Sequence, residues 1–312
     1  MIVENAFSRR GRRVAAILRR YLKDVRASEK VTWVRLTELA AEESPARLVL
    51  VVGGDGSING TASWMLARDF RCPIGVIPAG TGNNLARGLG IPLDPVSACR
   101  VALEGTAVVS LDGVLYRSSC DAQEGDNSRR LLIQAGALGF PAEIAARYDS
   151  LRRNTMFRAI VGPTGPYIYR ILAVVGIAKE RWRERLGDPA LKVRCRLAGE
   201  VIEEQVLAIF INNEKSLGGN FFPSPRAEID DGKLDICFVR ARTGHSYLRL
   251  LTRVARGEHL ELDDCVIYRQ SAQPVELRLS KACRFLADGD LWVKSDCYRL
   301  EVLPRRFEVI VR

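Results

Sequence analysis

A glycine-rich turn near residue 55 holds the first side chains whose types and spacing suggest chemistry. Residues 53–57, Gly-Gly-Asp-Gly-Ser, follow the apolar run Leu48–Val52 and precede a predicted helix. Glycines after a buried strand let the backbone approach a phosphate, and the N–H groups at the next helix start attract its charge. A carboxylate such as Asp55 fits beside phosphates when a Mg²⁺ lies between them. Taken alone, the turn fits a phosphate loop and a plain strand-to-helix turn equally well.

A second glycine turn strengthens the phosphate interpretation. Residues 78–84, Pro-Ala-Gly-Thr-Gly-Asn-Asn, follow the short apolar run Ile74–Ile77 and precede a predicted helix over Leu85–Leu89. Two such turns after neighbouring parallel strands face one crevice at the carboxyl edge of the sheet. Thr81 and Asn83 offer groups that either bind phosphate or brace the loop. The first turn is neither a Walker motif, because no lysine follows it, nor G-x-G-x-x-G, because Asn59 stands where the third glycine would be.

The elements that position these turns are predicted from periodicity. Residues 11–24 carry apolar side chains at helical spacing, and the run Leu48–Val52 is apolar on both faces, as in a central parallel strand. Helices are predicted over 58–69 and after Asp94-Pro95, so the first third has an α/β layer fold. From about Asp112 the pattern alternates with period two, which predicts antiparallel sheet. Strands are expected there at 131–134, 191–197, 206–211, 234–239, 275–279 and 298–303, with a helical insertion at 151–186.

Composition limits the setting in which this chemistry takes place. The 312 residues carry a formal net charge of +10, contain no apolar tract of about 20 residues, and begin without the apolar core of a signal peptide. We therefore expect a cytoplasmic protein that contacts the inner face of a membrane peripherally, where its basic surface would attract anionic lipid. Nucleic acid is not expected as a partner, because only Arg181-Trp182-Arg183 interleaves cations with a stacking ring.

Ordered motifs along nearly the whole chain resemble the diacylglycerol kinase catalytic domain, a family that includes sphingosine, ceramide and bacterial lipid kinases. Residues 53–57 resemble its G-G-D-G-T/S turn, and residues 78–84 its P-x-G-T-G-N-D segment. Asn5–Ser8 resembles the N-P-x-S loop with alanine for proline, and residues 139–142 its G-F-D-A segment. Further matches are P-x-A at 225–227, D-D-G-x-L-D at 230–235, and Asp288-Gly289-Asp290 where the family has D-G-E.

The resemblance implies two domains with the substrates meeting between them. Residues 1–112, completed by 302–312, would form a nucleotide-binding α/β domain of flavodoxin-like or NAD-kinase-like type. Residues 113–301 would form an antiparallel β-sandwich that takes the lipid. The cofactors implied are ATP and Mg²⁺, and the nucleotide-contacting residues implied are Asn5, Ala6, Phe7, Ser8, Arg9, Thr37, Gly53, Gly54, Asp55, Gly56, Ser57, Ile58, Asn59, Gly60, Gly80, Thr81, Gly82 and Asn83.

The resemblance also assigns carboxylate roles. Asp55 would organise the catalytic Mg²⁺, and Asp290 would be the general base toward the acceptor hydroxyl. Asp231, with backbone oxygens of Glu228 and Lys233, would hold a second, structural Mg²⁺. The residues alone instead favour plain hairpin turns at both Asp-Gly pairs, 231–232 and 288–289.

Three residues depart from the family pattern. Gly60 stands where the family has glutamate, which removes a charge and a capping-box partner for Ser57. Asp290 is one methylene shorter than the family's glutamate, and Asn84 replaces the usual aspartate after G-T-G-N.

The expected activity is transfer of the γ-phosphoryl group of ATP to a lipid hydroxyl, with diacylglycerol as the default acceptor. Two alternatives stay open at this point. One is a kinase of a soluble acceptor, because NAD kinases share the G-G-D-G turn. The other is a nucleotide-binding regulatory protein without catalysis, motivated by Gly60 and Asp290. A homodimer is an assembly that the sequence leaves open.

Overall fold

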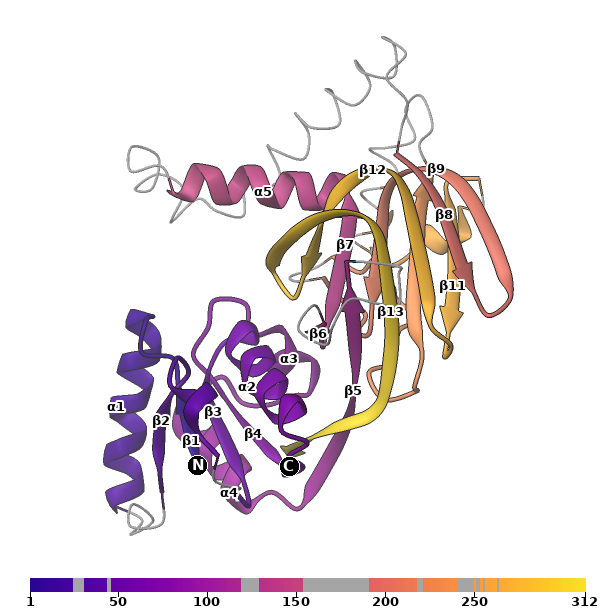
Figure 1. The fold of residues 1–312 in the computed structure, drawn as a ribbon. Coiled ribbons are helices and arrows are strands. Elements are labelled where there is room, and N and C mark those ends of the chain that lie inside the picture. Colours follow the sequence, from indigo (N-terminus) through magenta and orange to yellow (C-terminus); the bar gives the residue numbers. More distant parts are fainter. Residues whose placement is uncertain are drawn as a thin grey trace.

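The structure is a computed structural model, and it describes residues 1–24, 31–43, 46–118, 129–153, 191–217, 221–240, 250, 253–254, 256–262 and 264–312. It has an N-terminal α/β half and a C-terminal half built almost entirely of strands (Figure 1). Most of the predicted helical insertion at 151–186, including residues 181–183, lies outside the described residues. Only residues 151–153 of this range are described, and they end a helix. Within the described ranges, none of the helices has the length and apolar content needed to cross a bilayer.

The α/β half is built on four short parallel strands in the order β2-β1-β3-β4, which is the flavodoxin-like order. They are β1 (Ile2–Glu4), β2 (Trp33–Arg35), β3 (Val49–Gly53) and β4 (Ile74–Pro78). All five residues of β3 and of β4 are buried, as their unbroken apolar runs predict. Loops that follow these strands therefore gather at one edge of the sheet.

Helices cover this sheet at the predicted places. They are α1 (Arg9–Asp24), α2 (Asp55–Ala67), α3 (Asn84–Gly88) and α4 (Pro95–Glu104), with a short 3₁₀ turn η2 (Leu39–Ala41). α1 presents Val14, Leu18 and Leu22 to the core and its arginines to solvent. α4 begins as predicted, with the Asp94 carboxylate accepting the Ser97 N–H at 2.8 Å.

The C-terminal half is a β-sandwich whose strands close on themselves. Strand β9 pairs with β7 and β8, and β12 pairs with the same two strands, so the four form a ring. The strands are β6 (Arg130–Leu132), β7 (Ala135–Gly139), β8 (Leu191–Leu197), β9 (Glu200–Asn212), β10 (Leu234–Arg240), β11 (Val266–Ser271) and β12 (Val275–Ala287). Helix α5 (Phe140–Arg153) and a 3₁₀ turn, η4 (His259–Glu261), are among the elements that accompany them. The predicted fold class, an α/β domain followed by a β-sandwich, is confirmed.

Two long strands connect the halves. β5 (Ala107–Arg117) and β13 (Asp290–Val311) pair antiparallel along their length, from Val311↔Ala107 to Arg299↔Arg117. At its far end, β13 also pairs in parallel with β4 through Val309↔Ile74, so the chain terminus returns to the α/β sheet. The register between β5 and β13 shifts between Leu303 and Phe307.

The bend at this register shift is held by one carboxylate. Asp112 is buried and accepts the N–H groups of Arg305 and Gly232, each at 2.6 Å. Burial raises the pKa of Asp112, and these two hydrogen bonds act against that rise. The domain boundary that the sequence predicts at residue 112 lies inside β5 and stays a prediction.

Candidate active site

The two glycine turns lie in contact at the carboxyl edge of the parallel sheet. Gly54 is the N-cap residue of α2, and its carbonyl accepts the N–H of Ser57 at 2.9 Å. A Cβ placed on Gly80 would lie 2.5 Å from the Cα of Gly54, closer than any side chain allows. Both positions need glycine because the backbones touch, and the expectation that the two turns face each other is confirmed.

The N-terminal loop joins the two turns. Asn5 donates from Nδ2 to the Ser57 hydroxyl at 3.1 Å, and Arg10 donates to the Gly80 carbonyl at 2.9 Å. The Ser8 hydroxyl accepts the Gly11 N–H at 2.8 Å and so caps the start of α1. Among the other loop residues implied to contact nucleotide, the Phe7 side chain is 78% exposed. The segments that contain Asn5, Ser57 and Gly80 are thus held together by these hydrogen bonds.

The remaining loop residues have different environments. Asn83 is buried and braces its own turn, since its Oδ1 accepts the Gly80 N–H at 2.8 Å and its Nδ2 donates to the Gly80 carbonyl at 3.0 Å. Of the two roles considered for Asn83, bracing is the one that these contacts show. Thr81 and Gly82 are exposed beside it. Ile58 is a core residue whose side chain is not accessible to a ligand.

Thr37 and Gly60 mark the other border of this region. Thr37 is exposed just after β2, and a Cβ on Gly60 would meet only the neighbouring Leu36 side chain, at 3.4 Å. A Cβ on Gly56 would meet no atom within 4 Å, so the start of α2 faces open space. The space beside the first turn of α2 is therefore free for a ligand.

Asp55 is held in place by three donors. Its carboxylate accepts the N–H groups of Asn84 and Leu85, each at 3.1 Å, and the Gln134 side-chain amide at 3.2 Å. The carboxylate thus caps α3 and is joined to the β-sandwich through Gln134. Two oxygens have about four lone pairs, so one acceptor position of Asp55 is left over after these bonds.

Asp288 is the structural carboxylate of the predicted Asp288-Gly289-Asp290 motif. It accepts the N–H groups of Ile133 (2.8 Å), Gln134 (2.9 Å) and Ala135 (3.1 Å), and the Asn59 side-chain amide at 2.6 Å. Burial raises the pKa of Asp288, while these donors oppose the rise. Its φ of 47° and the φ of 90° at Gly289 form the tight turn between β12 and β13. The sequence indicated this turn but not the partners of Asp288.

Asp290 lies just beyond this turn, where β13 begins. It is exposed and pairs across the hairpin with Ala287. Loss of hydration around its carboxyl and, second to that, the negative charge of Asp149 raise the pKa of Asp290. Because Gln134 bonds both Asp55 and Asp288, the hairpin that carries Asp290 is tied to the glycine turns. The structure therefore brings Asp55 and Asp290 to one region.

Glu214 is a carboxylate of this region that sequence reasoning did not find. It follows β9, its N–H donates to the Gln134 carbonyl at 3.1 Å, and its Oε1 lies against Gly88 at the end of α3. Its Oε2 is buried without a hydrogen-bond partner among the described residues. Burial, followed by the charges of Asp55 and Asp288, raises the pKa of Glu214 to about 7. No local motif marks this residue, because its neighbours come from three distant segments.

The raised pKa of Glu214 predicts a pH-dependent stability. The folded chain holds this proton up to about pH 7 whereas the unfolded chain releases it near pH 4.5, so the free energy of unfolding falls as pH rises between these values. Glu214→Gln is expected to remove this fall and to be more stable than the parent above pH 7, by on the order of 2 kcal/mol. Urea unfolding at pH 4 and pH 8, without Mg²⁺ and nucleotide, measures the difference.

A matched control is Glu301→Gln, which neutralises an exposed carboxylate on β13. This control is expected to leave the pH dependence unchanged. The raised pKa of Glu214 would be contradicted if the parent protein lost no more stability than Glu214→Gln between pH 4.5 and pH 7.

The turn at 230–232 lies away from these carboxylates. Asp231 accepts the Lys233 N–H at 2.9 Å, and its carboxylate is 3.5 Å from the Lys233 ammonium. Gly232 has φ 72°, as the Asp-Gly hairpin interpretation requires. The Lys233 ammonium already lies beside the Asp231 carboxylate, so these contacts favour a plain hairpin turn over a metal site. The second Mg²⁺, held by Asp231 with the backbone oxygens of Glu228 and Lys233, stays a prediction.

The residues of the main site fit a Mg²⁺ that arrives with phosphates. Asp55 has one free acceptor position, and the described residues include no group of three carboxylate, histidine or cysteine side chains able to hold a metal by themselves. Mg²⁺ beside a nucleotide keeps several waters and uses one or two carboxylates plus phosphate oxygens. A single carboxylate with one free acceptor position suits a Mg²⁺ that is also bound by phosphate oxygens and water. It does not suit a site in which protein side chains supply every ligand.

Comparisons with known proteins show which domain families the two halves match. The sequence model of the diacylglycerol kinase catalytic domain matches residues 4–111. That of the YegS C-terminal NAD kinase beta sandwich-like domain matches residues 170–311. The two matches together cover both halves of the molecule, so the chain combines a diacylglycerol kinase catalytic domain with a YegS-type C-terminal domain.

Individual relatives agree with these two domain matches. A diacylglycerol kinase of Mycobacterium tuberculosis is 28% identical over 246 residues, which is 78% of this chain and 70% of the relative. One of Bacillus subtilis is 24% identical over 257 residues, 80% of this chain and 74% of the relative. A solved structure of a candidate diacylglycerol kinase from Bacillus anthracis has a TM-score of 0.68 at 18% identity, covering 100% of this chain and 96% of that one. The structural likeness supports the fold.

Proposed function

We propose that this chain is an ATP-dependent lipid kinase that transfers the γ-phosphoryl group to a lipid hydroxyl, with diacylglycerol as the first acceptor to test. The observation that carries the proposal is the Gln134 side chain and backbone, which tie Asp55 at the glycine turns to the Asp288–Asp290 hairpin of the sandwich. A nucleotide site and an acceptor-side carboxylate are thereby held together. The curated relatives, which are diacylglycerol kinases, support the choice of acceptor.

The triphosphate would bind where the two glycine turns meet. The start of α2 offers free N–H groups and the positive end of a helix dipole, and the Gly54–Gly80 contact keeps bulky side chains away. Asn5, Ser57 and Arg10 would fix the surrounding loops through their bonds to one another and to Gly80. Bound at Asp55, Mg²⁺ would neutralise charge that develops on the phosphate oxygens.

The acceptor would approach from the side of β13. The Asp290 carboxylate would take the hydroxyl proton while the acceptor oxygen bonds to the γ-phosphorus and the bond to the β-phosphate bridging oxygen breaks, which leaves ADP. Its elevated pKa makes it a stronger base than an ordinary aspartate. Because Asp290 is exposed at the start of the strand, it is accessible to a hydroxyl on a lipid held at a membrane surface.

The direct test is phosphate transfer from labelled ATP to a panel of acceptors in neutral mixed micelles. Transfer to diacylglycerol with Mg²⁺ present is the expected result. NAD and a sphingoid base belong in the same panel, since transfer to NAD would replace the lipid assignment. Binding of nucleotide without transfer to any acceptor would instead favour a non-catalytic regulator.

Replacement of the proposed base gives a separate prediction. Asp290→Ala is expected to lower kcat by about 10²–10³-fold, because general-base assistance of that size is lost. Nucleotide binding is expected to stay unchanged, and the unfolding midpoint is expected not to fall, since Asp290 makes no hydrogen bond that the structure records through its side chain and its ionised form is disfavoured in the fold. Steady-state kinetics and thermal melts of the same preparation check both statements.

The pH profile of kcat tests Asp290 independently. The acid limb should lie above the usual aspartate range, because loss of hydration and Asp149 raise the pKa of the base. Asp149→Asn should move that limb to lower pH. An unchanged limb in this variant, or wild-type kcat in Asp290→Ala, would contradict the role of Asp290.

A further inference from the structure

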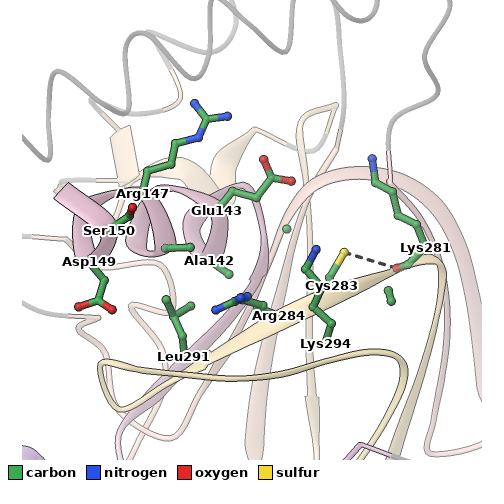
Figure 2. A pocket seen from close by; sticks show the side chains of 13 residues that line it. Ala142, Glu143, Arg147, Asp149, Ser150, Lys281, Cys283, Arg284, Leu291 and Lys294 are labelled. Atoms are coloured by element: carbon green, nitrogen blue, oxygen red, sulfur yellow. Dashed lines mark hydrogen bonds between the residues drawn. The ribbon is translucent and has the colours of Figure 1, made fainter. Parts of the chain in front are cut away.

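A cavity lies beside the proposed base, between helix α5 and the β12–β13 hairpin (Figure 2). Its volume is about 650 Å³, which is in the range of small-molecule sites. Leu291, the residue after Asp290, lines it, as does Asp149, whose charge acts on Asp290. The cavity therefore opens next to the carboxylate that would receive the acceptor hydroxyl.

Four cations line this cavity against two carboxylates. Arg147 comes from α5, Lys281 and Arg284 from β12, and Lys294 from β13. The carboxylates are Glu143 and Asp149. Within the part of the chain that the structure describes, none of the four cations forms an ion pair. Arg284 and Lys294 are thus available to a ligand, whereas Figure 2 shows the side chains of Arg147 and Lys281 extending away from Arg284.

The register of the hairpin makes this arrangement unfavourable without an anion. Arg284 and Lys294 are directly opposite each other in the β12–β13 pair. Like charges at opposed positions of an antiparallel pair destabilise it. Elsewhere on the sandwich strands, arginines lie beside carboxylates, as in Arg194–Glu203 at 3.2 Å and Arg269–Glu200 at 2.9 Å. Arg284 and Lys294 at the cavity have no such carboxylate partner among the described residues.

The side chains have the chemistry of an oxyanion site. Figure 2 shows Arg284 extended beneath α5 toward Leu291, with Lys294 nearby and Arg147 on the helix above. A guanidinium binds two oxygens of a phosphate at once, and an ammonium adds a point charge. Ala142, Ala282 and Leu291 provide apolar wall between the charges. A phosphate attached to a hydrocarbon-bearing alcohol matches this lining better than a neutral head group does.

We propose that this cavity binds a phosphate group carried by the acceptor, so that the substrate class includes lipid alcohols with a phosphate near the free hydroxyl. The inference rests on the proposed kinase function and extends its acceptors beyond neutral diacylglycerol. The phosphate would be held by Arg284 and Lys294, and the hydroxyl would point along the hairpin toward Asp290. The acceptor's acyl chain would leave along the apolar wall.

The test uses two short-chain probes that differ only in the phosphate, 1-hexanoylglycerol 3-phosphate and 1-hexanoylglycerol. Calorimetric binding to the full chain without ATP is expected to be at least tenfold tighter for the phosphate-bearing probe. Arg284→Gln should remove this difference. Arg47→Gln, which neutralises an exposed arginine just before β3, should keep it. The short chains avoid micelles, so general attraction to a charged surface does not enter.

Competition with inorganic phosphate distinguishes a site for a lipid-borne phosphate from a site for free phosphate. An acceptor site is supported if inorganic phosphate displaces the phosphate-bearing probe only at concentrations far above that of the probe. Equal affinity for inorganic phosphate, equal binding of the two probes, or an equal loss in Arg284→Gln and Arg47→Gln would overturn the proposal.

Turnover separates this inference from the function on which it rests. ATP-dependent phosphorylation of dihexanoylglycerol without selectivity in probe binding would overturn the phosphate site and leave the kinase assignment standing. Selective, Arg284-dependent binding with no transfer to any acceptor would support the site and overturn the kinase assignment.

Discussion

Replacing Asp288 with alanine is expected to lower the free energy of unfolding by about 4 kcal/mol, the largest stability effect that we expect from a single substitution in this region. Four donors, three of them backbone N–H groups at residues 133–135 and one the Asn59 amide, would lose their shared acceptor. Each unpaired buried donor costs about 1–3 kcal/mol, and the costs are less than additive. Alanine also tolerates the φ of 47° less well than aspartate does.

Asp288→Asn separates these two causes. Asparagine accepts the left-handed backbone but keeps only one acceptor oxygen, so we expect an intermediate loss of stability. Asp296→Ala, at an exposed position of β13, is the control for removing a carboxylate from this strand. Denaturant unfolding gives all three values. A loss below about 1 kcal/mol in Asp288→Ala would show that the network contributes little.

Asp55→Ala is expected to reduce phosphoryl transfer by about 10³-fold, because positioning and charge neutralisation supply most of the catalysis in this reaction. The same substitution removes the cap of α3, which is a five-residue helix with little else to fix its first turn. The loss of metal binding and the loss of the helix cap would both lower the rate. Binding of ATP measured with and without Mg²⁺ separates the two.

The metal role predicts a specific binding pattern. Asp55→Ala should weaken binding of Mg²⁺–ATP, and Mn²⁺ resonance should detect little metal on the variant when nucleotide is present. Binding of metal-free ATP should change less, since the glycine turns are kept together by the Gly54–Gly80 contact. An equal loss of both would assign Asp55 to capping alone. Asp94→Ala, which removes the cap of α4, is a matched control for loss of a helix cap.

Local patterns were sufficient for most of the elements that build the nucleotide side. Continuous apolar runs predicted β3 and β4, and glycines that follow both strands predicted their contact. Period-two alternation predicted β8, whose buried residues alternate with exposed ones along its full length. These predictions succeed because each depends on a single strand and its immediate neighbours.

β5 was not predicted, and the reason is physical. Its first residues are exposed, its central residues Leu111–Val114 are all buried, and its end alternates again. The strand passes from one half of the molecule to the other, so no single period describes its surroundings. The true lengths of β12 and β13 were missed for the same reason, since both continue beyond the segments that the alternation marked.

The sequence predicted the Asp288-Gly289-Asp290 turn but could not rank its carboxylates. Asn59 and Asp288 are 229 positions apart, and Glu214 contributes its carboxylate from a third segment. A motif fixes the backbone conformation of the turn, whereas the inward or outward direction of each carboxylate is decided by distant partners. The hydrogen-bonding role of Asp288 is therefore visible only from the tertiary contacts.

The paired strands β5 and β13 have a mechanical consequence. They run side by side between the two halves, and their pairing is interrupted at the register shift between Leu303 and Phe307, where Asp112 accepts the N–H groups of Arg305 and Gly232. This joint lies within the same strand that begins at Asp290. A shift of about 1 Å at the joint would therefore be passed along β13 and would misalign the proposed base with a nucleotide at the glycine turns.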